Sequence, residues 1–122
     1  MIIKESAENY LESILVLKNE KGFVRSIDVA NDLGVSKPSV SVAMKNFREE
    51  GYIIIDEEGH ISLTEKGLKI ANNVYERHEV IAKALILLGV GKETAYEDSC
   101  RIEHDISHET FEKIKEFIER HK

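Results

Sequence analysis

The segment SCRIEHDIS, residues 99–107, places a thiol, a carboxylate and an imidazole within five residues, at Cys100, Glu103 and His104. Positions i, i+3 and i+4 share one face of an α-helix, so these side chains project together if the segment is helical. All three groups are good ligands for a divalent transition metal. Three ligands on one helix cannot enclose a cation, so further ligands must come from elsewhere in the chain.

Two other helical segments offer suitable polar residues. Asn9 and Glu12 are three positions apart near the N-terminus, and His78 interrupts an apolar helical stripe. Each residue also has an ordinary explanation when taken alone. A lone cysteine is commonly a small buried hydrophobe, His78 could be a hydrogen-bonded core histidine, and Glu12 could be a solvated helix residue. The residues alone leave both the metal site and these separate explanations open.

A catalytic pair is a third interpretation of the same segment. Cys100 and His104 could act as nucleophile and base. The sequence offers no obvious third group to orient them and no oxyanion site, and two positions on one helix give a substrate poor access. We therefore expect no enzymatic activity.

The elements that must position these residues are mainly helical. Ser26, Ser36 and Ser107 are expected to cap helices, because their hydroxyls can accept free backbone N–H groups. Other helices are expected from Ser6 to about Asn19, from Thr64 to Gly89 and over roughly Glu93–His104. The segments YIIID (52–56) and HISL (60–63) predict two short strands joined by a turn.

Residues 26–63 therefore follow the order of a winged helix-turn-helix: helix, turn, helix, hairpin. The second helix has an apolar face (Val40, Met44, Phe47) and a face of lysines and small hydroxyls. Small hydroxyls allow close approach to the major groove, and lysines neutralise phosphates. The alternative is an amphipathic helix whose polar face meets only water. The residues expected to contact DNA are Lys37, Pro38, Ser39, Ser41 and Lys45 on this helix and His60 near the tip of the hairpin.

Composition limits the partners of the chain. A net charge of −6 argues against a general nucleic-acid coat. Residues 18–77 are nearly neutral, with nine Lys/Arg and ten Asp/Glu, so they can still present one positive face. One cysteine excludes an internal disulfide and suits a reducing compartment. The absence of a long apolar run and of a secretory signal predicts a cytoplasmic protein with no membrane partner.

Taken together, these segments resemble the iron-dependent (diphtheria toxin) repressor family of metal-sensing regulators, which includes manganese transport regulators. The resemblance is carried over nearly the whole chain by ENYLESI, DVANDLGVSKPSVSVAMKNFREEGYI, LTEKG, ERHEVIAKAL and CRIEHDIS. It implies a winged helix-turn-helix DNA-binding domain (residues 1–63) followed by a helical metal-binding and dimerisation domain (residues 64–122). It also implies a homodimeric repressor that binds operator DNA when Fe²⁺ or Mn²⁺ is bound.

Position by position, the resemblance implies a set of metal ligands. Asn9 stands where the family usually has methionine or aspartate, and Ala82 and Tyr96 replace ligands of an ancillary site. Cys100 resembles the iron-sensing branch, whereas the chain length resembles the manganese branch. Because a thiolate suits Fe²⁺ better than Mn²⁺, Fe²⁺ is the favoured metal and Mn²⁺ the close alternative. The alternative function is a winged-helix regulator that does not depend on metal. The implied ligands are Glu12, His78, Cys100, Glu103 and His104, with Asn9 as a further candidate.

Overall fold

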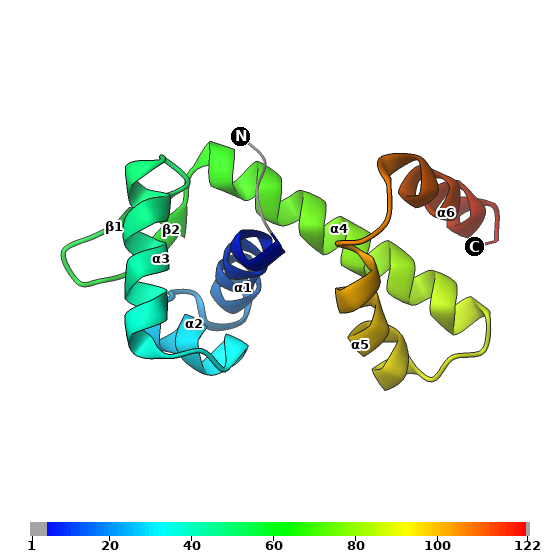
Figure 1. Cartoon of the computed structure of the whole chain (residues 1–122), viewed down its shortest axis with the longest axis horizontal. Coiled ribbons are helices and arrows are strands. Elements are labelled where there is room, and N and C mark those ends of the chain that lie inside the picture. Colours follow the sequence, from blue (N-terminus) through cyan, green and yellow to red (C-terminus); the bar gives the residue numbers. More distant parts are fainter. Residues whose placement is uncertain (1–4, 122) are drawn as a thin grey trace. The chain divides into compact units, whose positions relative to one another are not determined.

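The computed structural model describes residues 5–121, and the chain divides into two compact units, residues 1–72 and 73–122. The N-terminal unit contains α1 (Glu5–Lys21), α2 (Ser26–Leu33), α3 (Lys37–Glu49), β1 (Ile53–Ile55), β2 (Ile61–Leu63) and the first turns of α4 (Glu65–Leu87). The C-terminal unit contains the rest of α4, α5 (Lys92–Ile102) and α6 (His108–Arg120) (Figure 1). The mainly helical fold class is confirmed. The division after residue 63 remains a prediction.

The N-terminal unit is built around one apolar core. Leu11 and Ile14 of α1, Met44 of α3 and the strand residues Ile53 and Ile61 are each at most 2 % exposed. The two strands pair antiparallel to form the wing. Since α3 packs one face on this core, its opposite face is presented outward.

Helix starts follow local hydrogen-bond chemistry. The Ser36 hydroxyl accepts the Ser39 N–H at 3.3 Å, and the Ser107 hydroxyl accepts the Thr110 N–H at 3.1 Å, so both predicted caps are confirmed. The predicted Ser26 cap is wrong, because Ser26 is already the first residue of α2.

A carboxylate organises the start of α2 instead of a hydroxyl. The Asp28 side chain accepts the Arg25 N–H at 2.9 Å. This charge-assisted bond holds the pKa of Asp28 below its usual value, with help from the Lys21 ammonium 3.0 Å away. Ser6, at which a helix was expected to begin, is the second residue of α1.

Gly67 lets the first turn of α4 approach the segment that leads into β1. A Cβ atom at this position would overlap the carbonyl oxygen of Tyr52. The Thr64 N–H donates to that same oxygen at 3.0 Å, and the Thr64 hydroxyl accepts the Gly67 N–H at 3.2 Å. The junction between wing and helix therefore depends on a residue without a side chain.

In the C-terminal unit, polar contacts join α4 to its neighbours. Arg77 donates to the carbonyl of Ile106 at 3.0 Å, and its guanidinium lies over the Phe111 ring. Glu76 pairs with Lys115 of α6 at 2.7 Å. None of the helices within residues 5–121 has the length and apolar character needed to cross a lipid bilayer.

Candidate metal centre and nucleic-acid interface

Within the C-terminal unit, α4 and α5 bring an imidazole and a thiol together. The Sγ atom of Cys100 lies 3.2 Å from Nε2 of His78 and 3.9 Å from its Nδ1. Cys100 is exposed, so the explanation of this cysteine as a buried hydrophobe is wrong. Ligands in a tetrahedral zinc site with bonds of ordinary length have N and S about 3.6 Å apart. The observed pair therefore fits a shared cation with little adjustment.

The His78 ring is also in contact with the backbone of α5. Its Nε2 lies 3.1 Å from the Tyr96 carbonyl oxygen as well as near the thiol. A ring nitrogen carries at most one proton, so Nε2 can donate to only one of these groups at a time. With the ring proton on Nδ1, the lone pair of Nε2 becomes available to a cation beside the thiol. Nε2 of His78 can therefore either donate a hydrogen bond to the Tyr96 carbonyl or offer its lone pair to a cation beside Cys100.

Tyr96 ties the same two helices together through its phenol. Its hydroxyl donates to the Glu79 carboxylate at 2.9 Å, and this bond, with partial burial, raises the pKa of Tyr96. From the sequence, Tyr96 counted only as a missing ligand. Tyr96 contacts His78 through its backbone carbonyl. Every residue has this group, so the sequence could not have indicated the contact.

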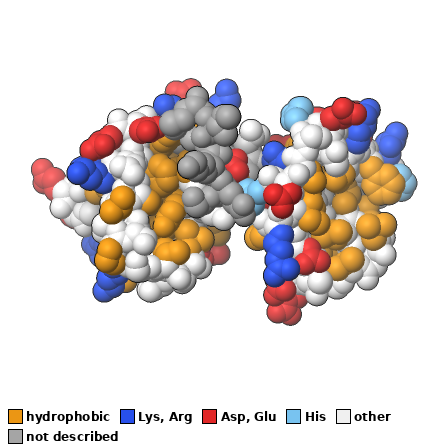
Figure 2. Space-filling view, viewed as in Figure 1, with side chains coloured by type: hydrophobic (Ala, Val, Ile, Leu, Met, Phe, Trp, Pro, Cys, Tyr) orange, Lys and Arg blue, Asp and Glu red, His pale blue; other side chains and the backbone are white. Residues whose placement is uncertain are grey.

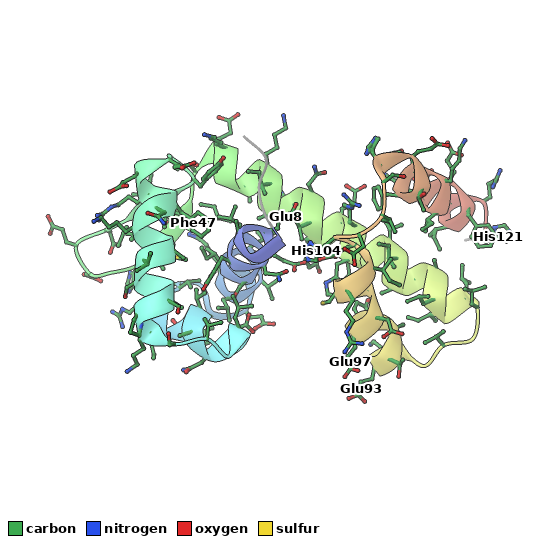
Figure 3. The ribbon with its side chains drawn as sticks, viewed as in Figure 1. Glu8, Phe47, Glu93, Glu97, His104 and His121 are labelled. Atoms are coloured by element: carbon green, nitrogen blue, oxygen red, sulfur yellow. The ribbon has the colours of Figure 1, made fainter. Side chains whose placement is uncertain are left out.

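Glu103 and His104 lie in the turn that follows α5, and Figure 3 labels His104 there. The helix expected over roughly Glu93–His104 is present as α5, but it ends two residues earlier, at Ile102. Glu103 nevertheless keeps helical backbone angles, and its N–H bonds to the Ser99 carbonyl at 3.0 Å. Its carboxylate therefore stays near the face that carries Cys100.

These two side chains are almost completely shielded from water. Their side-chain exposures are 1 % for Glu103 and 4 % for His104, and His104 Nε2 lies 3.3 Å from Glu103 Oε1. A ring nitrogen of His78 and a carboxylate oxygen of Glu103 lie within 4.8 Å of each other. Burying a carboxylate is costly unless a cation or hydrogen bonds compensate it. Thiol, imidazole and carboxylate donors thus gather in one unit of the chain, and this donor set suits a transition metal.

The remaining predicted ligands belong to the other unit. Asn9 and Glu12 both lie on α1, three positions apart, and both are half-buried. Their participation in a metal centre stays a prediction.

The outer face of α3 has the character that DNA contact requires. Lys37, Pro38, Ser39, Ser41 and Lys45 are all exposed, while Val40, Met44 and Phe47 are buried as the sequence predicted. DNA contact by the exposed residues stays a prediction. The first residues of α2, Ser26 and Ile27, line a shallow depression together with Lys37 and Ser41. The sequence did not indicate that these two residues lie beside the start of α3, because only the folded unit brings α2 next to it.

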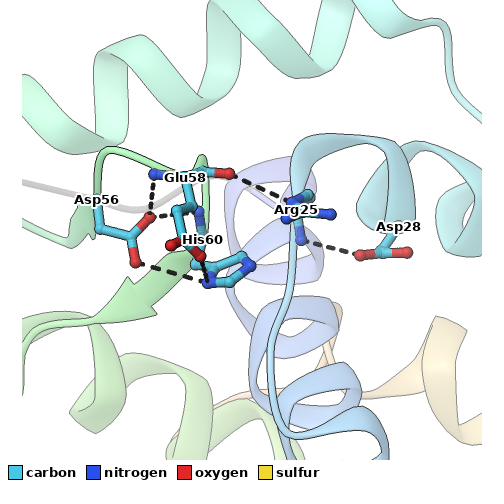
Figure 4. A network of polar contacts seen from close by, with 5 residues as sticks. All are labelled: Arg25, Asp28, Asp56, Glu58 and His60. Carbon is cyan, nitrogen blue, oxygen red and sulfur yellow. Dashed lines mark hydrogen bonds and ion pairs between the residues drawn. The ribbon is translucent and has the colours of Figure 1, made fainter.

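His60 is engaged inside the wing. Its ring lies against that of Phe23, with centroids 4.9 Å apart and the ring planes tilted by 30°. Its Nδ1 lies 3.6 Å from Asp56 Oδ2 (Figure 4). The Asp56 carboxylate accepts the backbone N–H groups of His60 and Glu58, which lowers the pKa of Asp56. Arg25 donates to the Glu58 carbonyl at 3.3 Å and so ties the wing to the start of α2.

The turn of the wing is acidic. Asp56, Glu57 and Glu58 are all exposed, and Figure 2 shows acidic side chains at the end of the wing. Carboxylates repel phosphates, so the positive charge available to DNA in this unit is better placed on α3 than on the wing.

Comparison with known proteins adds to this geometry. Residues 3–61 match the family model described as "Iron dependent repressor, N-terminal DNA binding domain", and residues 64–122 match "Iron dependent repressor, metal binding and dimerisation domain". The chain is also 35 % identical over 118 residues to the transcriptional regulator MntR of Escherichia coli O6:H1. That alignment covers 97 % of this chain and 76 % of the relative. This chain belongs to the iron-dependent repressor family.

Solved structures agree with membership of the iron-dependent repressor family. The crystal structure of T. acidophilum IdeR superposes with a TM-score of 0.81 at 26 % identity, covering 91 % of this chain and 53 % of that one. The structure of the manganese regulator SloR gives a TM-score of 0.78 at 26 % identity, covering 98 % and 55 %. The chain thus spans about half the length of these two structural relatives. The predicted family and the winged helix-turn-helix followed by a dimerisation domain are confirmed.

Proposed function

We propose that this chain is a metal-dependent transcriptional repressor that binds operator DNA as a homodimer. The observation that carries the proposal is the contact between Cys100 and His78, with buried Glu103 beside them, in a chain that also carries a winged helix-turn-helix. A helix-turn-helix explains DNA binding, and the ligand cluster supplies a reason for that binding to depend on a cation.

The proposed centre is formed by His78, Cys100, Glu103 and His104, joined by Glu12 and with Asn9 as a further ligand. A bound divalent metal supplies positive charge that offsets the charges of its ligands. Without that charge, the carboxylates of Glu12 and Glu103 would repel each other. Because Glu12 is on α1 and the other main ligands are in the C-terminal unit, their joint ligation would restrain one unit against the other.

Such a restraint would act on DNA binding through geometry. The two recognition helices of a dimer must reach successive major grooves, about 34 Å apart. Free units would sample many separations, and ligation would select those compatible with the operator. By linkage, operator DNA would then tighten metal binding by the same factor.

Fe²⁺ is the metal we favour, and Mn²⁺ is the alternative. The Cys100 thiol supports Fe²⁺, because Mn²⁺ prefers oxygen ligands. One structural relative is named as a manganese regulator, which supports Mn²⁺. Zn²⁺, Co²⁺ and Ni²⁺ are expected to bind such a site more tightly than either, so affinity in vitro does not identify the physiological metal.

Apolar side chains of the C-terminal unit support the homodimer. A groove on this unit is lined by Ala84 and Leu88 of the α4 region and by Ile114 and Phe117 of α6. Leu88 is 76 % exposed and follows the exposed residues Ile86 and Leu87, so the exposed apolar surface here is contiguous. A second copy of this chain would cover these side chains.

The test is anaerobic DNA binding by fluorescence anisotropy, with a duplex selected by the protein from random-sequence DNA. We expect Fe²⁺ or Mn²⁺ to increase affinity by at least about tenfold and a chelator to reverse the increase. The double variant Glu103→Ala/His104→Ala should remove the stimulation, whereas Glu97→Ala, an exposed carboxylate on α5 (Figure 3), should retain it. Equal affinity with and without metal would reject the proposal in favour of a metal-independent regulator.

A further inference from the structure

One apolar side chain lies in the middle of the outward face of α3. Val42 is 61 % exposed, although the other large apolar residues of this helix, Val40, Met44 and Phe47, are buried. Single exposed hydrophobic residues are common on protein surfaces and need no explanation by themselves. Val42 is informative because of the residues that surround it.

Its surroundings are those of a groove-reading surface. Val42 lies three positions after Ser39 and three before Lys45, so helical geometry puts all three on one stripe. Both neighbours are exposed, and the segment from Lys37 to Arg48 contains no acidic residue. A surface that is positive, narrow and lined with small side chains suits the major groove, and Val42 is at its centre.

The chemistry of the major groove indicates what a valine can recognise there. The base edges present hydrogen-bond donors and acceptors, together with one apolar group, the C5-methyl of thymine. Valine has no polar side-chain atom to replace the water removed from a donor or acceptor. Contact with a thymine methyl breaks no hydrogen bond to water, and it removes apolar surface of both groups from water.

We propose that Val42 contacts the C5-methyl of a thymine and so selects an A·T pair at one position of each half-site. This inference rests on the proposed function, because it requires that α3 enters the major groove. It adds a specificity-determining residue and the base that this residue favours.

The test replaces thymine by deoxyuridine, which removes only the methyl group. A duplex is first selected by the full-length protein from random-sequence DNA in the presence of Mn²⁺. Each thymine of a half-site is then replaced in turn, and affinity is measured by anisotropy. We expect one replacement to weaken binding of the unaltered protein by about fourfold, the value of one buried methyl group.

Variants assign that effect to a residue. Val42→Ala should bind the thymine and deoxyuridine duplexes equally, and it should fold normally, since alanine favours an exposed helical position. Ile54→Ala removes an aliphatic side chain that is 59 % exposed on β1, and it should keep the fourfold difference. Lys45→Ala should weaken binding to both duplexes alike, as loss of a phosphate contact would.

The outcomes separate this inference from the proposed function. If metal-stimulated, sequence-specific binding is observed but no thymine shows a methyl effect, or the effect survives in Val42→Ala, the role of Val42 is overturned and the proposed function stands. If the protein selects no DNA sequence with Mn²⁺ or Fe²⁺ present, the proposed function fails and the role of Val42 fails with it.

Discussion

The two units of this chain differ in how their exposed apolar side chains are distributed. In the N-terminal unit, α1, α3 and the strands share one buried cluster, and the exposed apolar residues are distributed over separate elements, as Phe23, Val42 and Ile54 illustrate. In the C-terminal unit, three consecutive exposed residues, 86–88, end the α4 region. Figure 2 shows hydrophobic side chains gathered on the surface of this unit. The first unit completes its core within one chain, whereas the second presents a surface that the proposed dimer would cover.

The largest expected effect tests that contrast directly. The double variant Leu87→Asp/Leu88→Asp should weaken dimerisation by at least about 100-fold, because it would place two carboxylates where apolar burial stabilises the dimer. Analytical ultracentrifugation over a concentration series measures the change. Ile54→Asp, at a similarly exposed aliphatic residue of the N-terminal unit, is the matched control and should leave the dissociation constant unchanged. Equal association of all three proteins would place the dimer interface elsewhere.

The second prediction concerns the close packing of the N-terminal unit at Gly67. Gly67→Ala should lower the free energy of unfolding by about 1–3 kcal/mol, since the new methyl group would overlap the Tyr52 carbonyl. Urea denaturation followed by circular dichroism provides the measurement. Gly91→Ala, in the C-terminal unit, is the control, because a Cβ there meets nothing within 4 Å. A Gly67→Ala protein as stable as the unaltered chain would show that the backbone at this junction can shift without lowering the free energy of unfolding.

The contrast between the units also explains what the sequence could predict. The caps at Ser36 and Ser107 and the buried face of α3 follow from residue type and helical spacing, and the structure confirms all of them. These features are local, so neighbouring residues determine them. The start of α2 was predicted less well, because Asp28, not the hydroxyl of Ser26, supplies the hydrogen bond.

Prediction of the candidate metal centre from the residues alone was less complete. The type and spacing of Cys100, Glu103 and His104 indicated candidate ligands, but not that α5 ends at Ile102. The close approach of His78 to Cys100 depends on packing between helices, which spacing within one helix does not encode. The Tyr96 carbonyl that contacts His78 is a backbone group and leaves no trace in the sequence.

Acid and alkali should affect the two units in opposite ways. In the C-terminal unit, the hydrogen bond to Glu79 raises the pKa of Tyr96, so its contribution to stability is present below about pH 10 and is lost as the pH rises further. In the N-terminal unit, Asp28, like Asp56, is a carboxyl whose pKa is lowered. Its contribution must therefore be lost at the acidic end.

The smallest predicted effect follows from that carboxyl. The hydrogen bond from the Arg25 N–H and the nearby Lys21 ammonium hold the pKa of Asp28 below its ordinary value of 3.8. The resulting stability is complete well above that value and disappears as the pH falls through the folded-state pKa. Asp28→Asn should therefore cost about 0.5 kcal/mol at neutral pH, as loss of a helix-start interaction does, and progressively less as the pH falls below the ordinary value of 3.8. Urea denaturation at several pH values measures this, with Glu57→Gln on the wing as the control. An Asp28→Asn deficit that persisted unchanged into acid would mean that the carboxylate's shape, and not its charge, stabilises the start of α2.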